Sequence, residues 1–369
     1  MDTDKKFMRK ALALARKGLG RTSPNPAVGA VIVRNRKIIA SGFHRKAGEN
    51  HAEVEALANL GGKAERGDTL YVTLEPCNHY GRTPPCTKAI LESGIERVVV
   101  GLVDPNPTVA GGGCGFLRKK GVDVKIGVLE PECRRLNEWF PKFSKTGHPF
   151  VVGKSALTLD GWTATSMGHA RWVTNEKSRQ LVHQMRDSLD AVMVGVGTVV
   201  ADDPSLTTRL KKSGGRDPAR IIVDTHLRIP GHAKVLNHRS GSETFIAFGE
   251  GESEEKREAL KREGVSPLCC PTKNGRVDLK SLMAMLGDMG ITSLMVEGGA
   301  TLMASMIGDR LIDKFCIFQS PKILGGGDGI PMVAGKGPEK MDGCIRLKDV
   351  QVTQLGGDIL LEGYPDYPG

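Results

Sequence analysis

The sequence predicts an α/β protein with two domains that meet near residue 147. The chain has 369 residues, which is more than one hydrophobic core usually organises. In both halves, short apolar segments rich in Val, Ile and Leu alternate with helical patterns, as in layered α/β domains. Residues 145–150, KTGHPF, have the composition of a linker. We therefore expect one domain at residues 1–147 and a second at residues 148–369.

The first domain is predicted to begin with an amphipathic helix over residues 4–19. Arg16 and Lys17 end its apolar part too early for a secretory signal peptide, and no cleavage site of small residues follows. Strands are then predicted at 27–33, 37–42, 69–74, 97–104 and 122–128, and helices at 51–60, 84–94, 112–120 and from residue 131.

The second domain is predicted to start with a strand at residues 149–161. The charged run at 249–263 is interpreted as a solvated helix face. Helices are predicted at 175–187 and 278–288, strands at 190–199, 219–225, 243–249 and 313–321, and a strand that opens into a helix within 293–307.

Positive charge is concentrated in the first domain. Residues 1–149 hold 25 Lys and Arg against 15 Asp and Glu, whereas residues 150–369 hold 27 of each kind. Such an excess fits nucleic acid, an anionic small molecule such as a phosphate ester, or solubility alone. No apolar run reaches the length of a membrane span. Eight cysteines without a secretion signal indicate a reducing compartment, so we expect a cytoplasmic protein.

A zinc site is predicted from three residues of the first domain. His51 opens the helix HAEVEALANL, Cys77 follows a proline at the end of a predicted strand, and Cys86 follows a proline at the start of a helix. One imidazole and two thiolates are the ligand set of a catalytic zinc whose fourth position is open to water. Such a metal lowers the pKa of its water to about 7. Glu53 is then expected to carry the proton of this water to a leaving amine.

Other interpretations of this pattern stay open at this point. His51 and Glu53 could belong to an ordinary helix N-terminus, where acidic residues are favoured. A structural zinc would need a fourth protein ligand, and His79 could supply it. The spacing from Cys77 to Cys86 is also longer than the P-C-x-x-C of known zinc deaminases. The remaining cysteines are interpreted as core or surface thiols: Cys114, Cys133, Cys269, Cys270, Cys316 and Cys344.

Four stretches within residues 20–107 together resemble the deaminase half of the bifunctional riboflavin-biosynthesis deaminase–reductase family. They are SPNPAVGAVIV, GFHRKAGENHAEVEAL, EPCNHYGRTPPC and VVVGLVDPNP. The long cysteine spacing is the usual form in that family. The resemblance implies a cytidine-deaminase-like three-layer α/β/α fold and hydrolytic deamination of a phosphoribosylamino-diaminopyrimidinone. It places Asn25, His44, His79 and Arg82 at the substrate, although each could instead be a turn residue or a surface charge.

The second domain resembles the reductase half of the same family. The matching stretches are KSALTLDGWTA, ARWVT, VGVGTVVADDPSLTTR and VEGGATL. Taken alone, the glycine pair at 195–197 is weak evidence for a nucleotide, and VEGGATL could be a plain strand–helix turn or an anion site at a helix N-terminus. The resemblance implies a dihydrofolate-reductase-like fold that uses NADPH to reduce the ribosyl group of the deaminated product to a ribityl chain.

The resemblance also assigns site residues in the second domain. Arg186 and Arg209 suit a phosphate, because a guanidinium can bind it with two hydrogen bonds. Ala170 stands where the family often has Ser, so the grip on the phosphate must differ here. The implied substrate positions are Lys154, Ala170, Arg186, Leu206, Arg209 and Glu297. The implied cofactor positions are Ala156, Trp172, Thr198, Asp202, Thr225, Gly299, Ala300, Thr301, Leu302, Met303, Ala304 and Ser305.

Two competing functions share part of this pattern. A nucleic-acid base deaminase would explain the zinc site and the charge, but not the reductase stretches. It would also need an aromatic binding surface, and the chain has few aromatic residues. A non-catalytic zinc-stabilised module fused to a nucleotide sensor would keep its function without Glu53. We therefore expect Zn²⁺ and NADPH as cofactors and a small phosphorylated pyrimidine as substrate. We expect no nucleic acid, no membrane, and a homo-oligomer.

Overall fold

The computed structural model describes residues 3–80, 84–105, 112–211, 215–237, 240–261 and 264–368. Contacts between Cα atoms divide the chain into two compact units, Met1–Gly147 and His148–Gly369. Below they are called unit 1 and unit 2. The segment expected to be a linker, residues 145–150, is partly helical, because α6 (Phe140–Thr146) extends into it, and β6 (Phe150–Leu157) begins at its last residue.

Unit 1 is built on a mixed five-stranded sheet with the strand order β2-β1-β3-β4-β5. The strands β1 and β2 form an antiparallel hairpin, β1 and β3 are also antiparallel, and β3, β4 and β5 are parallel. All six residues of β3 are buried, as expected for a strand covered on both faces. The strands are β1 (Gly29–Arg34), β2 (Lys37–Phe43), β3 (Thr69–Leu74), β4 (Arg97–Leu102) and β5 (Asp123–Ile126).

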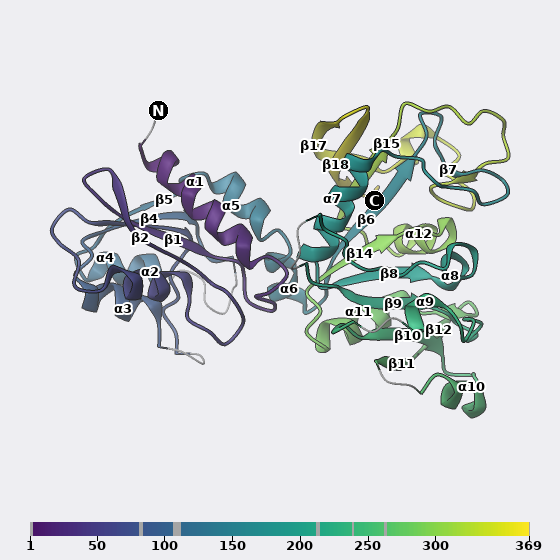
Figure 1. The fold of residues 1–369 in the computed structure, drawn as a ribbon, viewed down its shortest axis with the longest axis horizontal. Helices are drawn as coiled ribbons and strands as arrows, with labels where there is room; N and C mark the ends of the chain where they lie inside the picture. The colour runs from purple at the N-terminus through teal and green to yellow at the C-terminus, as the bar shows by residue number, and fades with distance from the viewer. Residues whose placement is uncertain are drawn as a thin grey trace. The chain divides into compact units, whose positions relative to one another are not determined.

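Helices cover both faces of this sheet and complete the predicted three layers (Figure 1). The helices α1 (Thr3–Ala15) and α5 (Glu130–Leu136) lie on one face. The other face carries α2 (Ala52–Leu60), α3 (Cys86–Ser93) and α4 (Gly113–Lys119). The first helix ends earlier than predicted, because residues 16–18 form a 3₁₀ turn.

Unit 2 contains a nine-stranded sheet within the described residues, with the order β11-β10-β9-β8-β14-β6-β15-β18-β17. The strands from β11 to β15 in this order pair in parallel, and β18 and β17 are antiparallel. Besides β6, they are β8 (Ala191–Gly195), β9 (Ala219–Val223), β10 (Thr244–Gly249), β11 (Val265–Cys270), β14 (Ser293–Glu297), β15 (Lys314–Gln319), β17 (Arg346–Leu355) and β18 (Asp358–Asp366). Two short pairs, β7 (Trp162–Ala164) with β16 (Ile330–Pro331) and β12 (Thr272–Lys273) with β13 (Arg276–Val277), lie outside it.

The parallel sheet of unit 2 has a hydrophobic core on each face. Ala191 and Met193 of β8 belong to one core, and the alternating Val192 and Val194 belong to the other. The first core includes α11 (Leu279–Asp288) and α12 (Ala300–Gly308), and the second includes α8 (Val196–Asp202) and α9 (Lys234–Asn237). The other two helices described in this unit are α7 (Glu176–Ser188) and α10 (Glu254–Ala259). None of the residues of α10 is buried.

Three parts of unit 2 differ from the predicted elements. The predicted strand at 190–199 ends at Gly195, and a helix follows because Val196 and Val199 are buried at helical spacing. The strand β11 and the hairpin β17–β18 were absent from the prediction. Most of β17 is exposed and its sequence is polar, so the apolar signal of a buried strand is missing there.

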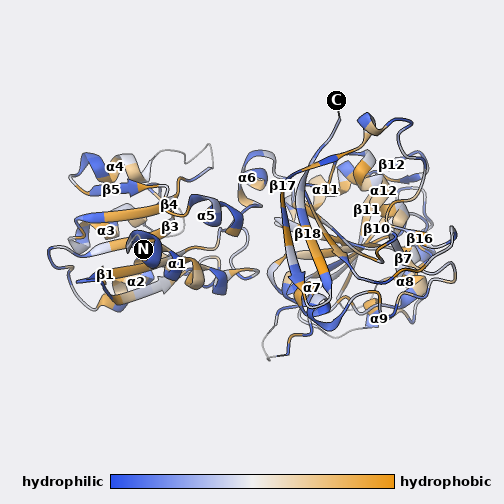
Figure 2. Ribbon diagram, turned by 90° about the horizontal axis from the view of Figure 1, so that it is seen from above, coloured by the Kyte–Doolittle hydropathy of each residue, from blue (hydrophilic) through white to orange (hydrophobic). Residues whose placement is uncertain are grey.

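Hydropathy follows these layers, since strands of both sheets carry hydrophobic residues while α7 is largely hydrophilic (Figure 2). Among the described residues, none of the helices combines the length and apolar character needed to cross a bilayer.

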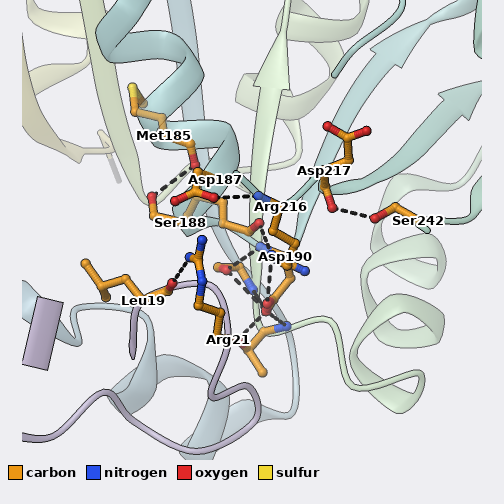
Figure 3. A network of polar contacts seen from close by, with 12 residues as sticks. Leu19, Arg21, Met185, Asp187, Ser188, Asp190, Arg216, Asp217 and Ser242 are labelled. Atoms are coloured by element: carbon orange, nitrogen blue, oxygen red, sulfur yellow. Dashed lines mark hydrogen bonds and ion pairs between the residues drawn. The ribbon is translucent and has the colours of Figure 1, made fainter. Parts of the chain in front are cut away.

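A polar network closes one end of the sheet in unit 2 (Figure 3). The Asp190 carboxylate, which precedes β8, accepts hydrogen bonds from the backbone N–H and the hydroxyl of Thr292 at 2.9 and 2.6 Å. It also accepts from Ser293 at the start of β14. The Arg216 backbone N–H donates to Asp187 at 2.7 Å. These bonds align the starts of β8 and β14. The opposite end of β14 carries Glu297, which belongs to the candidate site of unit 2.

Candidate active sites

Three ligand atoms converge in unit 1. His51 Nδ1, Cys77 Sγ and Cys86 Sγ all lie within 4.8 Å of one another. The Nδ1 atom of His51 is 3.2 Å from Cys86 Sγ and 3.5 Å from Cys77 Sγ. The backbone N–H of Cys86 donates to Cys77 Sγ at 3.3 Å. The long loop between the two cysteines therefore brings both sulfurs to one point.

Local backbone structure explains this convergence. His51 is the extended N-cap of α2, and Cys86 is the first residue of α3. Cys86 thus lies at the positive end of a helix, which favours its thiolate form. Cys77 follows Pro76, whose carbonyl oxygen would lie 1.9 Å from a Cβ atom at Gly113. Only glycine therefore allows α4 to approach the Cys77 segment so closely.

Glu75 anchors the same segment from the other side. This buried carboxylate accepts hydrogen bonds from the backbone N–H groups of Asp104 at 3.0 Å and Cys114 at 2.8 Å. The end of β3, the end of β4 and the start of α4 are thereby tied together next to Cys77.

Glu53 lies in the first turn of α2, two residues after His51, and only 3 % of it is exposed. Burial raises the pKa of Glu53 to about 7. A carboxyl group of this kind can accept and return a proton near neutral pH.

The structure also brings Asn25 and His44 to this site. The Asn25 amide nitrogen is 3.1 Å from His44 Nε2, and His44 Nδ1 is 3.0 Å from the carbonyl oxygen of Asn50. A carbonyl only accepts, so Nδ1 of His44 carries the proton and Nε2 accepts from Asn25. Burial lowers the pKa of His44, which keeps its ring neutral. The His44 and His51 rings pack edge to face at 5.3 Å.

These residues fit a zinc ion with a free coordination position. One nitrogen and two sulfur donors suit zinc better than a hard cation such as magnesium. Within the described part of the chain, the cluster that could hold a metal consists of these three residues. His79 is exposed and does not belong to it. Arg82 lies outside the described residues.

In unit 2, a buried carboxylate is held by two cations. Glu297 ends β14 and pairs in register with Lys154 of the parallel neighbour β6. Arg186 of α7 reaches Glu297 with Nε at 2.6 Å and a terminal nitrogen at 2.9 Å, and Lys154 Nζ lies at 3.9 Å. Burial alone would raise the pKa of Glu297, but the charges and hydrogen bonds of Arg186 and the charge of Lys154 lower it to about 2. The Glu297 side chain is therefore an anion.

A cavity of about 470 Å³ opens onto this triad. Its lining also includes Arg209, Trp172, Phe318, Arg179 and His183. The His183 Nδ1 atom accepts a hydrogen bond from the Arg209 backbone N–H at 3.3 Å. Burial and the charges of Arg186 and Arg209 lower the pKa of His183 to about 4, so its ring is neutral.

The predicted cofactor positions lie mostly at the carboxyl ends of the parallel strands. Gly298 and Gly299 have φ of 76° and 82°, which other residues rarely adopt. They lead into α12, the helix that contains Ala300, Thr301, Leu302, Met303, Ala304 and Ser305. Thr198 of α8 lies against this turn, since its Oγ1 atom would be 3.2 Å from a Cβ atom at Gly299. Backbone N–H groups at such a turn can face a pyrophosphate.

Other predicted positions are dispersed around this turn. Ala156 lies two residues after Lys154 on β6, Asp202 ends α8, and Leu206 is buried with φ of 52°. The Thr225 hydroxyl, just after β9, accepts from the backbone N–H of Val277. Ala170 lines a separate cavity of about 200 Å³, which shares Trp172 with the larger one.

The sequence analysis missed Arg179 and His183 of the larger cavity. On α7, His183 lies four residues after Arg179 and three residues before Arg186, and this spacing places the three on one helix face. This spacing was the available signal.

The fold and the two sites define a zinc-binding deaminase domain joined to a reductase domain. Residues 1–102 match the cytidine and deoxycytidylate deaminase zinc-binding region, and residues 149–361 match the RibD C-terminal domain. The riboflavin biosynthesis protein RibD of Aquifex aeolicus is 43% identical over 360 residues, 98% of both chains. RibD of Escherichia coli is 38% identical over 97% of this chain and 98% of its own.

Two solved structures match the fold of this chain over almost its whole length. A diaminohydroxyphosphoribosylaminopyrimidine deaminase/5-amino-6-(5-phosphoribosylamino)uracil reductase from Thermotoga maritima has a TM-score of 0.83 at 38% identity, and covers 99% of both chains. Acinetobacter baumannii RibD has a TM-score of 0.85 at 37% identity, with the same coverage.

The chain therefore belongs to the RibD family of bifunctional riboflavin biosynthesis enzymes, which have a zinc-binding deaminase domain and a reductase domain. The family, the fold class and the two activities predicted from the sequence are confirmed.

Proposed function

We propose that unit 1 deaminates a diaminopyrimidinone that carries a phosphoribosylamino group, with release of ammonia. Unit 2 then reduces the ribosyl group of the product to a ribityl chain with NADPH. The observation that carries the first step is the convergence of His51, Cys77 and Cys86 beside the buried Glu53. The relatives from Thermotoga maritima and other bacteria support this choice of substrate.

In unit 1, His51 Nδ1 and the two cysteine sulfurs would hold the zinc ion. The ion supplies Lewis acidity, which makes a water molecule a nucleophile at neutral pH. The Glu53 carboxylate takes the proton of this water and delivers it to the amine that leaves. Asn25 and His44, linked by a hydrogen bond of fixed direction, orient the pyrimidine ring. His79 and Arg82 are the further substrate positions that the family resemblance implies.

In unit 2, the turn at Gly298–Gly299, α12 and Thr198 would hold NADPH, which supplies a hydride. Lys154 Nζ protonates the ring oxygen of the sugar, which becomes a hydroxyl as its bond to the carbon that receives the hydride breaks. Burial, which lowers the pKa of Lys154, makes it a better acid. Glu297 accepts hydrogen bonds from the sugar and keeps Lys154 in place. Ala156, Trp172, Asp202 and Thr225 are further cofactor positions.

The two steps can be tested separately in one protein. Zinc-loaded protein is supplied with the phosphorylated diaminopyrimidine, and ammonia release and NADPH oxidation are followed in parallel. Glu53→Gln should abolish ammonia release, keep one zinc per chain, and still oxidise NADPH when the deaminated product is supplied. Glu297→Gln should abolish NADPH oxidation with the deaminated product and leave zinc content and ammonia release unchanged. Ammonia release at the wild-type rate in Glu53→Gln would refute the assignment. A cytoplasmic location and a homo-oligomeric state stay predictions.

A further inference from the structure

The last part of unit 1 lies outside both family matches, which cover residues 1–102 and 149–361. Residues 103–147 nevertheless contain β5 and the helices α4, α5 and α6 of the same unit. Asn137, between α5 and α6, is a polar residue of this segment, and it is only 3% exposed. A buried amide needs partners for its donor and its acceptor, so its contacts indicate its role.

The side chain of Asn137 binds both backbone groups of Ala27, which lies 110 residues earlier in the chain. Asn137 Nδ2 donates to the carbonyl oxygen of Ala27 at 2.9 Å, and Oδ1 accepts from the Ala27 N–H at 2.8 Å. Ala27 is 1% exposed, so these two backbone groups depend on protein partners. Asn137 therefore pairs with Ala27 as a residue of a neighbouring β-strand would.

Asn137 is itself held in place by the fold. Its backbone N–H donates to the carbonyl oxygen of Arg134 in α5 at 3.3 Å, and its carbonyl oxygen accepts from the Phe140 N–H at 3.0 Å. The helix α5 packs closely on β4, because a Cβ atom at Gly101 would lie 2.3 Å from Cys133 Sγ. The amide of Asn137 is therefore presented from a fixed position.

The loop of residues 22–29, below called the Asn25 loop, leads into β1. The carbonyl oxygen of Val28 accepts from the His44 N–H at 2.9 Å. The N–H of the next residue donates to Thr73 Oγ1, in the buried strand β3, at 3.2 Å. These bonds fix the end of the loop at the sheet.

Asn137 acts on the part of the loop that holds Asn25. Ala27 is two residues after Asn25, whose side-chain amide nitrogen lies 3.1 Å from His44 Nε2. The backbone N–H of Asn25 donates to the carbonyl oxygen of Thr22 at 2.7 Å, so the turn before Ala27 is compact. A shift of Ala27 would therefore move Asn25 away from His44, because few rotatable bonds separate the two loop residues.

We propose that Asn137 is a positioning residue for deamination, and that it acts through Ala27 on Asn25. It keeps the Asn25 amide at the distance from His44 at which both side chains can orient the pyrimidine ring. This inference rests on the proposed function of unit 1, in which Asn25 and His44 contact that ring. It extends the deaminase site to a residue beyond the stretch that matches the deaminase zinc-binding region.

The test compares Asn137→Ala with Asn25→Ala in the full-length, zinc-loaded protein supplied with the phosphorylated diaminopyrimidine. Loss of a positioned substrate contact predicts that kcat/KM for ammonia release falls at least about tenfold in both variants. The loss should divide between KM and kcat in the same way in both, whereas general destabilisation would lower kcat in parallel with zinc content. Zinc content and NADPH oxidation with the deaminated product should equal those of the wild type.

Asn137→Ser decides the question if Asn137→Ala does not retain zinc. A serine hydroxyl keeps a polar group at this position, but its single oxygen on a shorter side chain cannot bind both backbone groups of Ala27 at once. Ammonia release should therefore fall in this variant too, by a smaller factor. A wild-type kcat/KM in the zinc-loaded variants of Asn137 would contradict the inference.

The double variant Asn25→Ala with Asn137→Ala shows whether Asn137 acts through Asn25. If it does, the kcat/KM of the double variant equals that of Asn25→Ala, because the same contact can be lost only once. Two losses that multiply would show a separate role and overturn the inference. Asn59→Ala is the matched control, since it removes an exposed hydrogen bond from Asn59 Nδ2 to the carbonyl oxygen of Ser41 at 2.9 Å, and it should behave as the wild type.

Amide hydrogen exchange separates this inference from the proposed function. At constant pH, a peptide that contains residues 22–29 should exchange at least about tenfold faster in Asn137→Ala than in the wild type or in Asn59→Ala. If the wild type releases no ammonia from the diaminopyrimidine, the proposed function fails, and the exchange rates still decide whether Asn137 holds the Asn25 loop. Equal exchange in all three proteins overturns the inference.

Discussion

Glu53 of unit 1 and Glu297 of unit 2 are both deeply buried in a candidate site, and the two have opposite electrostatic environments. Glu53 lies beside two cysteines and one histidine, and burial raises its pKa to about 7. Glu297 is equally enclosed, yet its pKa is about 2, because Arg186 and Lys154 outweigh the effect of burial. The comparison shows that burial alone does not decide the state of a carboxyl group. The neighbours decide whether it exchanges protons or stays a fixed charge.

The difference matches the two proposed roles. A group that carries a proton from water to a leaving amine must change its protonation state during each turnover. A group that orients a cation and a sugar works best with a constant charge, which its bidentate guanidinium partner maintains.

Removal of a zinc ligand should have the largest effect. Cys86→Ser is expected to lose bound zinc and all ammonia release, because the site cannot hold the metal with two ligands. Zinc content by elemental analysis and ammonia release check this. NADPH oxidation with the deaminated product should continue, and Cys344→Ser serves as the control for loss of a thiol outside the cluster. Full zinc content in Cys86→Ser would exclude Cys86 as a ligand.

Arg186→Met should raise the pKa of Glu297, because it removes the main charge that opposes the effect of burial. The environment of Glu297 would then resemble that of Glu53. Removing one partner of a buried pair usually destabilises a protein by about 3–5 kcal/mol, and reduction should fall strongly as Glu297 loses its orientation. Denaturant unfolding of the full-length chain measures the stability. The double variant Arg186→Met with Glu297→Leu should recover only part of the stability, because Lys154 then lacks its anionic partner, and it should recover no activity. A single variant as stable as the wild type would contradict the buried pair.

Unit 2 should lose stability in acid in two steps. The pKa of His183 falls from 6.5 to about 4 on folding, so the folded form gains stability above pH 6.5 and loses it progressively toward pH 4. The pKa of Glu297 falls from 4.5 to about 2, and its contribution is lost between these values. Unfolding measured against pH should show both windows.

Variants identify the two windows. His183→Gln should flatten the stability profile between pH 6.5 and 4, and Glu297→Gln should flatten it between pH 4.5 and 2. A profile unaffected by either substitution would mean that these groups do not change their pKa on folding.

The smallest effect is expected at the exposed pair Glu176–Lys211. Its side chains are 63% and 69% exposed, so water and salt screen their attraction. Glu176→Gln should leave the unfolding midpoint within error of the wild type. A marked loss of stability would contradict the expectation that this exposed ion pair contributes little to the stability of unit 2.

Sequence reasoning worked best where the signal is local. The apolar segment at 69–74 became β3 with the predicted bounds, since it is short and flanked by polar residues. It worked less well at 190–199, where one continuous apolar run contains both β8 and α8 and carries no break that periodicity could detect. The polar hairpin β17–β18 gave no hydrophobic signal at all.

The same distinction applies to the sites. His51, Glu53, Cys77 and Cys86 could be selected from the sequence, because residue type and short spacing limit what a metal can use. Arg179 and His183 were not selected, because their spacing with Arg186 indicates a shared helix face but does not show that this face meets a cavity until the helix is placed against the sheet.

The sequence by itself determined the family, the two-domain organisation that was expected, and the identity of the candidate metal ligands. Tertiary structure alone decided that Lys154 and Glu297 lie side by side in register and that Arg186 is occupied by Glu297. It also decided that Arg179 stacks on Trp172 within the same unit. The physical reason is that ligand chemistry depends on residue type, whereas pairing depends on contacts between residues far apart in the chain.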